Sequence, residues 1–162
     1  MQIRLLITGG TIDKSYNMSN GELHFVDSHI PDMLARGRNR LAVEIETLML
    51  VDSLDMSDQG RLQIVSRCRE CEENHIVITH GTDTMVETAR LLQDMVEDKT
   101  IVLTGAMIPW VFEDSDALFN LGGALAAAQC QPPGVYIVMN GRVFDANNVV
   151  KNRDEGVFET LL

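Results

Sequence analysis

Two threonines in this chain follow glycines at the ends of short apolar runs. Thr11 comes directly after Gly9 and Gly10, and Thr82 comes directly after Gly81. A threonine hydroxyl becomes a nucleophile once a base or a hydrogen-bond partner activates it. Glycine lets the backbone turn sharply and approach a ligand closely. Two such hydroxyls, far apart in the sequence, could therefore face one substrate.

Each threonine also has an ordinary structural interpretation. Thr11 could cap a turn, and Thr82 or Asp83 could satisfy the free amide groups at the start of a helix. A hydroxyl beside a carboxylate could instead orient a proton or bind an ammonium group. The full run of residues 80–84, His-Gly-Thr-Asp-Thr, is seldom met by chance and favours the chemical interpretation.

Composition narrows the classes of partner. The chain has 162 residues, an apolar fraction of 45% and a formal net charge of -11, which suit one globular domain with a core. Such an acidic surface repels phosphate, so we expect no nucleic acid and no membrane as partner. No apolar run approaches the roughly 20 residues of a membrane helix. The first residues lack the pattern of a signal peptide, so we expect a cytoplasmic location.

The cysteines form no framework of disulfides, because Cys68, Cys71 and Cys130 are odd in number. Cys68 and Cys71 could be a redox pair or half of a zinc site. No second pair exists and the four histidines have no ligand spacing, so we favour reduced thiols on a helix. We expect no metal and no other cofactor.

Apolar runs and helical patterns alternate along the chain. The five runs that predict strands are residues 3–8, 43–51, 76–79, 100–104 and 135–139. The three patterns that predict helices are residues 59–73, 84–96 and 116–129, the last with Ser115 as its N-cap.

This alternation predicts an α/β fold with three layers, in which a doubly wound, mostly parallel sheet lies between helices. We expect the flavodoxin-like strand order 2-1-3-4-5 within a single domain, residues 1–162. The first and third strands are then neighbours at the point where the strand order reverses, and ligands bind beyond the carboxyl ends of strands there. Thr11 and Thr82 would lie on the two walls of one crevice.

Six segments resemble the motifs of the bacterial-type L-asparaginase family and follow the family's order over nearly the whole chain. They are residues 8–12 (Thr-Gly-Gly-Thr-Ile), 52–56 (Asp-Ser-Leu-Asp-Met), 80–85 (His-Gly-Thr-Asp-Thr-Met), 104–109 (Thr-Gly-Ala-Met-Ile-Pro), 115–121 and 139–151.

The resemblance implies that Thr11 is the primary nucleophile. It also implies a second catalytic group, in which Lys151 and Asp83 polarise Thr82 or an attacking water. Lys151 could otherwise be a solvated surface lysine. Tyr16 lies on the loop that in this family helps to activate the first threonine and closes the site, although it could also be an exposed loop aromatic.

The resemblance further implies hydrolysis of the side-chain amide of asparagine or of a related small amide, through an acyl-enzyme and with release of ammonia. Ser53 and Asp83 would hold the α-carboxylate and α-amino groups, and backbone amides near Thr82 and Ala106 would bind anionic groups. The substrate-binding residues expected on this basis are Gly10, Ser53, Asp55, Gly81 and Ala106.

Two other functions remain open from the sequence. One is a protein of the same fold that binds aspartate or asparagine without hydrolysis. The other is a nucleotide- or phosphate-binding domain, for which the Gly9-Gly10 turn could serve, although the chain has no G-x-G-x-x-G motif or P-loop.

Some features depart from the family pattern. The family has a second domain, which the resemblance does not find in residues 1–162. Leu54 stands where many members have a polar residue that holds the substrate amine, and Ala117 replaces a glycine. The last residues, 157–162, are apolar at helical spacing, so we expect a homodimer or larger homo-oligomer with this tail in or near the interface.

Overall fold

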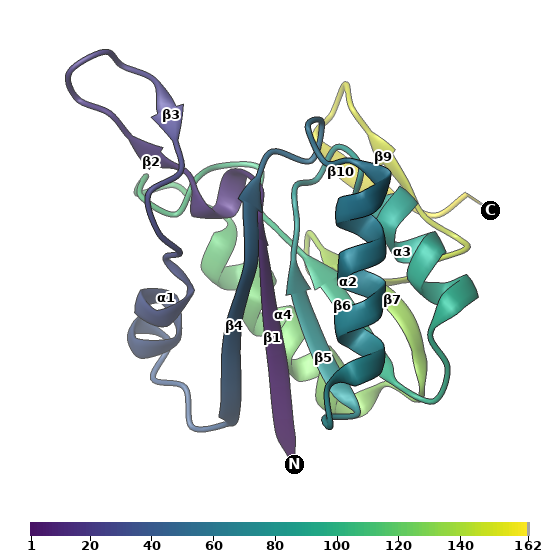
Figure 1. Ribbon diagram of the computed structural model, residues 1–162. Coiled ribbons are helices and arrows are strands. Elements are labelled where there is room, and N and C mark those ends of the chain that lie inside the picture. The colour runs from purple at the N-terminus through teal and green to yellow at the C-terminus, as the bar shows by residue number, and fades with distance from the viewer. Residues whose placement is uncertain (162) are drawn as a thin grey trace.

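A six-stranded sheet forms the centre of the computed structural model, which describes residues 1–161. Its strand order is β4-β1-β5-β6-β7-β8 (Figure 1). The first five strands in this order are parallel, and β8 pairs antiparallel with β7. The predicted order 2-1-3-4-5 is therefore confirmed, with one further strand at the edge. The bounds are β1 Gln2–Gly9, β4 Ala42–Val51, β5 His75–Thr79, β6 Thr100–Thr104, β7 Gly134–Met139 and β8 Arg142–Asp145.

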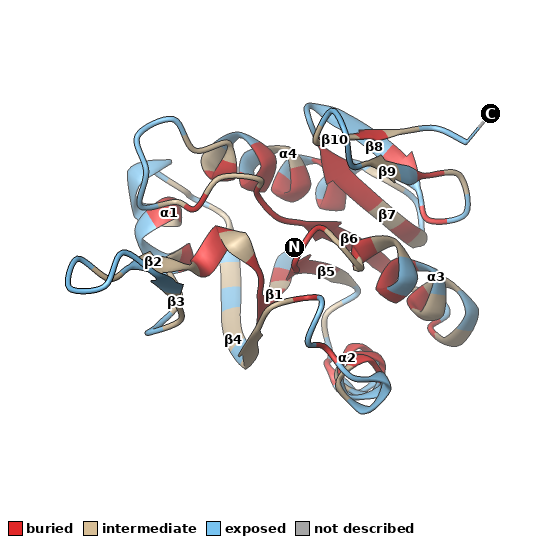
Figure 2. Ribbon diagram, turned by 90° about the horizontal axis from the view of Figure 1, so that it is seen from above, coloured by how far each residue is buried: buried red, intermediate tan, exposed pale blue. Residues whose placement is uncertain are grey.

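Helices cover both faces of this sheet, as Figure 2 shows, so the predicted three layers are confirmed. On one face lie α2 (Asp58–Glu70) and α3 (Met85–Met95), which share a buried cluster. On the other lie α1 (Ile30–Arg36) and α4 (Ala117–Cys130), which share a second cluster. None of the helices in the described part of the chain is both long and apolar enough to cross a membrane.

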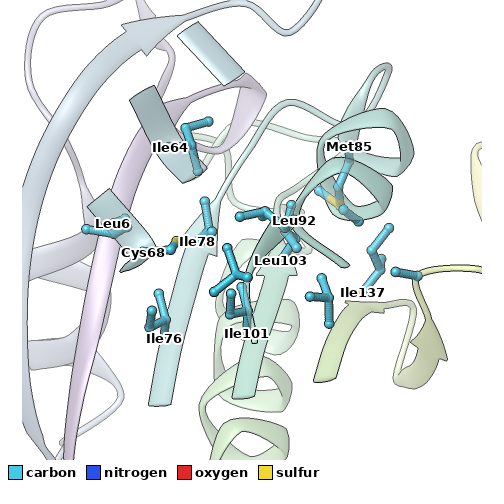
Figure 3. Close-up of a cluster of buried hydrophobic side chains, with 14 of the residues drawn as sticks. Leu6, Ile64, Cys68, Ile76, Ile78, Met85, Leu92, Ile101, Leu103 and Ile137 are labelled. Atoms are coloured by element: carbon cyan, nitrogen blue, oxygen red, sulfur yellow. The ribbon is translucent and has the colours of Figure 1, made fainter. Parts of the chain in front are cut away.

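The core explains why the strands read as continuous apolar runs. Successive strand side chains point to opposite faces, and both faces here are covered by helices. Ile78 and Leu103 pack toward α2 and α3 (Figure 3), whereas Val77 and Val102 pack toward α1 and α4. All four side chains are fully buried.

The structure adds elements that the sequence patterns did not predict. One is α1, a short helix of seven residues, and another is β8 at the sheet edge. Two small antiparallel hairpins complete the fold. Their strands are β2 (Ser15–Tyr16) with β3 (Leu23–His24), and β9 (Val150–Asn152) with β10 (Val157–Glu159).

The helical spacing expected for the tail is wrong, because residues 157–159 form the strand β10. Gly156 has a φ of 66° and ends the turn that reverses the chain after β9. Phe158 is then buried in the core of the same protomer, with only 2% of its surface exposed. The last residue of the predicted tail, Leu162, lies outside the described residues.

Candidate active site

Three strand ends meet without spare room at the proposed site. Gly10 has a φ of 81°, and a Cβ atom built on it would lie 2.4 Å from the backbone nitrogen of Gly81. A Cβ built on Gly81 would lie 2.5 Å from Cβ of Ser53. Because β1 pairs in parallel with both β4 and β5, the segments that follow these strands leave the sheet side by side. The glycines are therefore required by close packing.

Thr11 opens a single 3-10 turn, Thr11–Asp13, directly after this contact and is half-buried. The turn is anchored from inside by Asp13, whose carboxylate is fully buried. It accepts hydrogen bonds from Oγ of Ser28 at 3.0 Å and from the backbone nitrogen of His29 at 2.8 Å. Burial raises the pKa of Asp13 above its ordinary value, against the opposing effect of these hydrogen bonds.

The second threonine is held by a lysine from a distant part of the chain. Nζ of Lys151, on β9, donates to Oγ1 of Thr82 at 2.8 Å and to Oδ1 of Asp83 at 2.9 Å. The Lys151 side chain is only 10% exposed, and that of Asp83 is 30% exposed. The hairpin β9–β10 brings Lys151 to the end of the sheet at which the parallel strands finish (Figure 1). The structure thus joins three residues that the sequence singled out.

This group has a definite chemical capacity. Because Lys151 occupies a lone pair on the Thr82 oxygen, the proton of that hydroxyl is free to point elsewhere. An ammonium 2.8 Å from the oxygen would stabilise an alkoxide there.

Arg153 joins the same carboxylate and was not singled out from the sequence. Its guanidinium donates to Oδ1 of Asp83 at 2.8 Å and to the backbone oxygen of Asp83 at 3.1 Å. It lies two residues beyond Lys151, at the start of the turn that follows β9. That spacing was the one available signal.

His80 positions the loop that carries these residues. Its ring is buried, with Nδ1 2.8 Å from the backbone oxygen of Gly81 and Nε2 2.8 Å from Oγ1 of Thr88. Burial lowers the pKa of His80 to about 4. The neutral ring therefore donates from Nδ1 to Gly81 and accepts from the Thr88 hydroxyl.

Ser53 supplies an unused hydroxyl beside this loop. It is 1% exposed, and its Oγ has no hydrogen-bond partner within residues 1–161. Its backbone oxygen accepts a hydrogen bond from Oγ1 of Thr84 at 2.9 Å, which ties Ser53 to the second motif. Leu54 is 67% exposed, and Asp55 is also exposed, in the turn that follows.

Ala106 follows β6 and is buried next to the same loop. The preceding residue, Gly105, packs so closely that a Cβ there would lie 2.4 Å from the backbone oxygen of His80. The next two amides, of Met107 and Ile108, each donate to the Asp116 carboxylate at 3.0 Å. Asp116 therefore fixes the backbone after Ala106.

Nearly the whole chain resembles known proteins of one family. The family model described as "Asparaginase, N-terminal" matches residues 2–158. This chain belongs to the asparaginase family. L-asparaginase 2 of Escherichia coli is 32% identical over 96% of this chain, and a glutaminase-asparaginase of Acinetobacter glutaminasificans is 34% identical over 91%.

A solved structure described as a probable cytoplasmic L-asparaginase from Campylobacter jejuni matches with a TM-score of 0.86 and 29% identity over 98% of this chain. The chain spans about half the length of these relatives: 47% of the Escherichia coli protein, 48% of the Acinetobacter protein and 52% of the Campylobacter structure.

Tyr16 packs on an aromatic side chain of another loop, and the described residues show no side-chain hydrogen bond from it to Thr11 or Thr82. It sits on the β2–β3 hairpin, which extends away from the body of the protein (Figure 1), and is 48% exposed. Its ring packs edge-on against Phe112 with a centroid separation of 6.0 Å. Its hydroxyl lies near Gly21 in the turn of the same hairpin.

Proposed function

We propose that this asparaginase-family chain hydrolyses the side-chain amide of L-asparagine or of a related small amide. The observation that carries the proposal is Lys151, which hydrogen-bonds both Thr82 and Asp83 although it lies 68 residues beyond Asp83 in the chain. The names of the relatives, L-asparaginase and glutaminase-asparaginase, agree with amide hydrolysis.

In the proposed reaction, Thr11 attacks the carbonyl carbon of the amide. The hydroxyl proton passes to the departing nitrogen, ammonia leaves, and an ester to Thr11 remains. Water then attacks this ester, which frees the carboxylic acid and restores the Thr11 hydroxyl. Backbone amides near Thr82 and Ala106 would stabilise the oxyanion in both steps.

Thr82, Asp83 and Lys151 would act as one unit in this reaction. Lys151 fixes the Thr82 oxygen, and Asp83 fixes Lys151. The free proton of Thr82 is then available to orient the attacking water or the leaving group. No metal or other cofactor enters the proposed steps.

A second candidate is a protein that binds aspartate or asparagine without hydrolysis. The position of Tyr16 favours it, because this aromatic packs against Phe112 and the described residues show no side-chain hydrogen bond from it to Thr11. The unused hydroxyl of Ser53 would serve a bound carboxylate equally well in either function.

Ammonia release from asparagine, glutamine and other small amides separates the candidates. We expect turnover by the wild type, and its loss in Thr11→Ala and Thr82→Val. Ser66→Ala, an exposed position on α2, is the control and should keep full turnover. Tight aspartate binding without turnover would favour the binding protein, and nucleotide binding without any hydrolysis would defeat the amidohydrolase.

We also propose that the protein is a homodimer or larger homo-oligomer. An apolar hollow of about 650 Å³ runs along α4 and β8, where the α4 sequence contains no charged residue. Two copies of a chain with net charge -11 would approach best through such an uncharged face. The hollow is lined by Phe119, Gly122, Gly123, Ala126, Cys130 and Val143, among others. Phe119 lies at its edge with 67% of its surface exposed, and in a dimer it would insert into the same hollow of the partner.

Light scattering at micromolar concentration tests this assembly. A wild-type dimer that becomes monomeric in Phe119→Glu is the expected result, with Leu23→Glu, an exposed apolar residue on the hairpin, as the control. A monomeric wild type would overturn the proposal.

We also propose a cytoplasmic location. The three cysteines in the described residues are free thiols, and free thiols persist in a reducing compartment. The relatives differ in their names: the Campylobacter jejuni structure is called cytoplasmic and a Haemophilus influenzae relative periplasmic. Cell fractionation with an antibody to the native chain tests the location, and recovery outside the cytoplasm would contradict it.

A further inference from the structure

Arg153 makes a contact that the proposed hydrolysis does not require. It opens the turn between β9 and β10, and the turn is fixed because Asn152 Oδ1 accepts from the backbone nitrogens of Asp154 and Glu155, both at 3.2 Å. From this position the guanidinium bonds both the carboxylate and the backbone oxygen of Asp83, at 2.8 Å and 3.1 Å. Arg153 is thus aimed at Asp83 by a structured turn.

The contact changes the charge beside Thr82. Lys151 and Arg153 share one oxygen, Oδ1 of Asp83, so two cations meet one carboxylate. Within residues 1–161, no ion pair joins Arg153 to the carboxylates of Asp154 or Glu155, which follow it in the turn. On a chain with net charge -11, this group carries an excess of one positive charge.

This charge bears on what Asp83 can bind. A carboxylate beside a hydroxyl could hold a substrate ammonium, but Oδ1 of Asp83 is already shared by two cations. Lys151 alone would leave this carboxylate in a neutral pair, whereas Arg153 adds a second cation that an incoming ammonium would meet, and like charges at short range repel. The site therefore disfavours a substrate with a free amine next to Asp83.

The same charge favours an anionic group. The Arg153 side chain is 62% exposed, so guanidinium N–H groups remain available to a carboxylate, which arginine can bind in a bidentate manner. The buried Ser53 hydroxyl, without a partner in the described residues, offers a further donor next to Gly81.

We propose that Arg153 determines specificity, so that the preferred substrate is the ω-amide of a dicarboxylic acid without a free α-amino group. Succinamate, which is asparagine without its amine, is the simplest such molecule. This inference rests on the proposed amide hydrolysis and names its substrate class. Hydrolysis of succinamate by Thr11 would yield succinate and ammonia.

Binding of the two products tests the inference apart from catalysis. Calorimetry with succinate and with L-aspartate compares the wild type with Arg153→Gln. The control is Arg69→Gln, an arginine on α2 that hydrogen-bonds the Met95 backbone oxygen and gives the same change in net charge. Ammonia release from succinamate and asparagine is measured on the same three proteins.

We expect the wild type to bind succinate about tenfold more tightly than aspartate, from one exposed ion pair together with ammonium repulsion. Arg153→Gln should lose this preference, while Arg69→Gln should keep it. Aspartate bound as tightly as succinate by the wild type, or an unchanged ratio in Arg153→Gln, would overturn the inference. Succinate binding with no ammonia from either amide would instead refute the proposed hydrolysis and leave the binding preference intact.

Discussion

Replacement of Gly10 by alanine should disturb the meeting of the two threonine loops. The added Cβ would lie 2.4 Å from the Gly81 nitrogen, and ordinary contact begins at 3.4 Å, so the loops must separate by about 1 Å. The backbone of Gly10, at φ 81° and ψ 177°, also lies in a region nearly restricted to glycine. Backbone strain of about 1–3 kcal/mol and overpacking of about 1–3 kcal/mol give a loss of about 2–6 kcal/mol in the free energy of unfolding.

Catalysis should suffer beyond the loss of stability. A displacement of about 1 Å between catalytic groups can cost about 100-fold in rate. The assay is urea unfolding followed by circular dichroism, with ammonia release corrected for the folded fraction. Gly60→Ala, within α2, is the matched control, because its Cβ would lie 3.4 Å from the nearest atom, which belongs to the Met56 side chain. It should gain up to about 1 kcal/mol from the better helix propensity of alanine. A Gly10→Ala variant with wild-type stability and turnover would refute this reasoning.

Three further outcomes are expected. Lys151→Met should abolish turnover yet cost less than about 2 kcal/mol of unfolding free energy, because Arg153 still pairs with Asp83. Unchanged turnover in this variant would mean that Lys151 has no catalytic role. His80 has a folded pKa of about 4 and an unfolded value near 6.5, so the unfolded state binds its proton first as the pH falls. Its contribution, about 3 kcal/mol, should be present above pH 6.5 and lost between pH 6.5 and 4, and a His80→Gln variant with the same pH dependence would contradict this. Burial raises the pKa of Cys68 to about 12, so a thiol reagent should leave Cys68 unmodified in the native protein, and its rapid modification would be contrary to the structure.

The central strands could be predicted because both of their faces are buried. Residues 76–79 and 100–104 are apolar runs bounded by polar residues, and the structure gives strands His75–Thr79 and Thr100–Thr104. The edge strand β8 lacks this signal, because Arg142 and Val143 are exposed. Short elements such as α1 carry too few apolar residues for a period to appear.

The site was less accessible from the sequence than the fold. The predicted strand order already placed Thr11 and Thr82 at the same end of the sheet. No local sequence pattern shows which residue from the later part of the chain contacts them. The β9–β10 hairpin makes that return, and it brings Arg153 together with Lys151. Tyr16 was a candidate site residue only because of the family resemblance. In the structure, it lies on the β2–β3 hairpin and packs against Phe112.

The joint action of Thr82 and Lys151 can be tested by one cycle of variants. Ammonia release from succinamate and asparagine is measured for the wild type, Thr82→Val, Lys151→Met and the double variant, each checked for folding. Because the two side chains share a hydrogen bond of 2.8 Å, we predict that the double variant loses no more activity than either single variant. Independent losses that multiply in the double variant, or full turnover in both single variants, would contradict a shared catalytic unit.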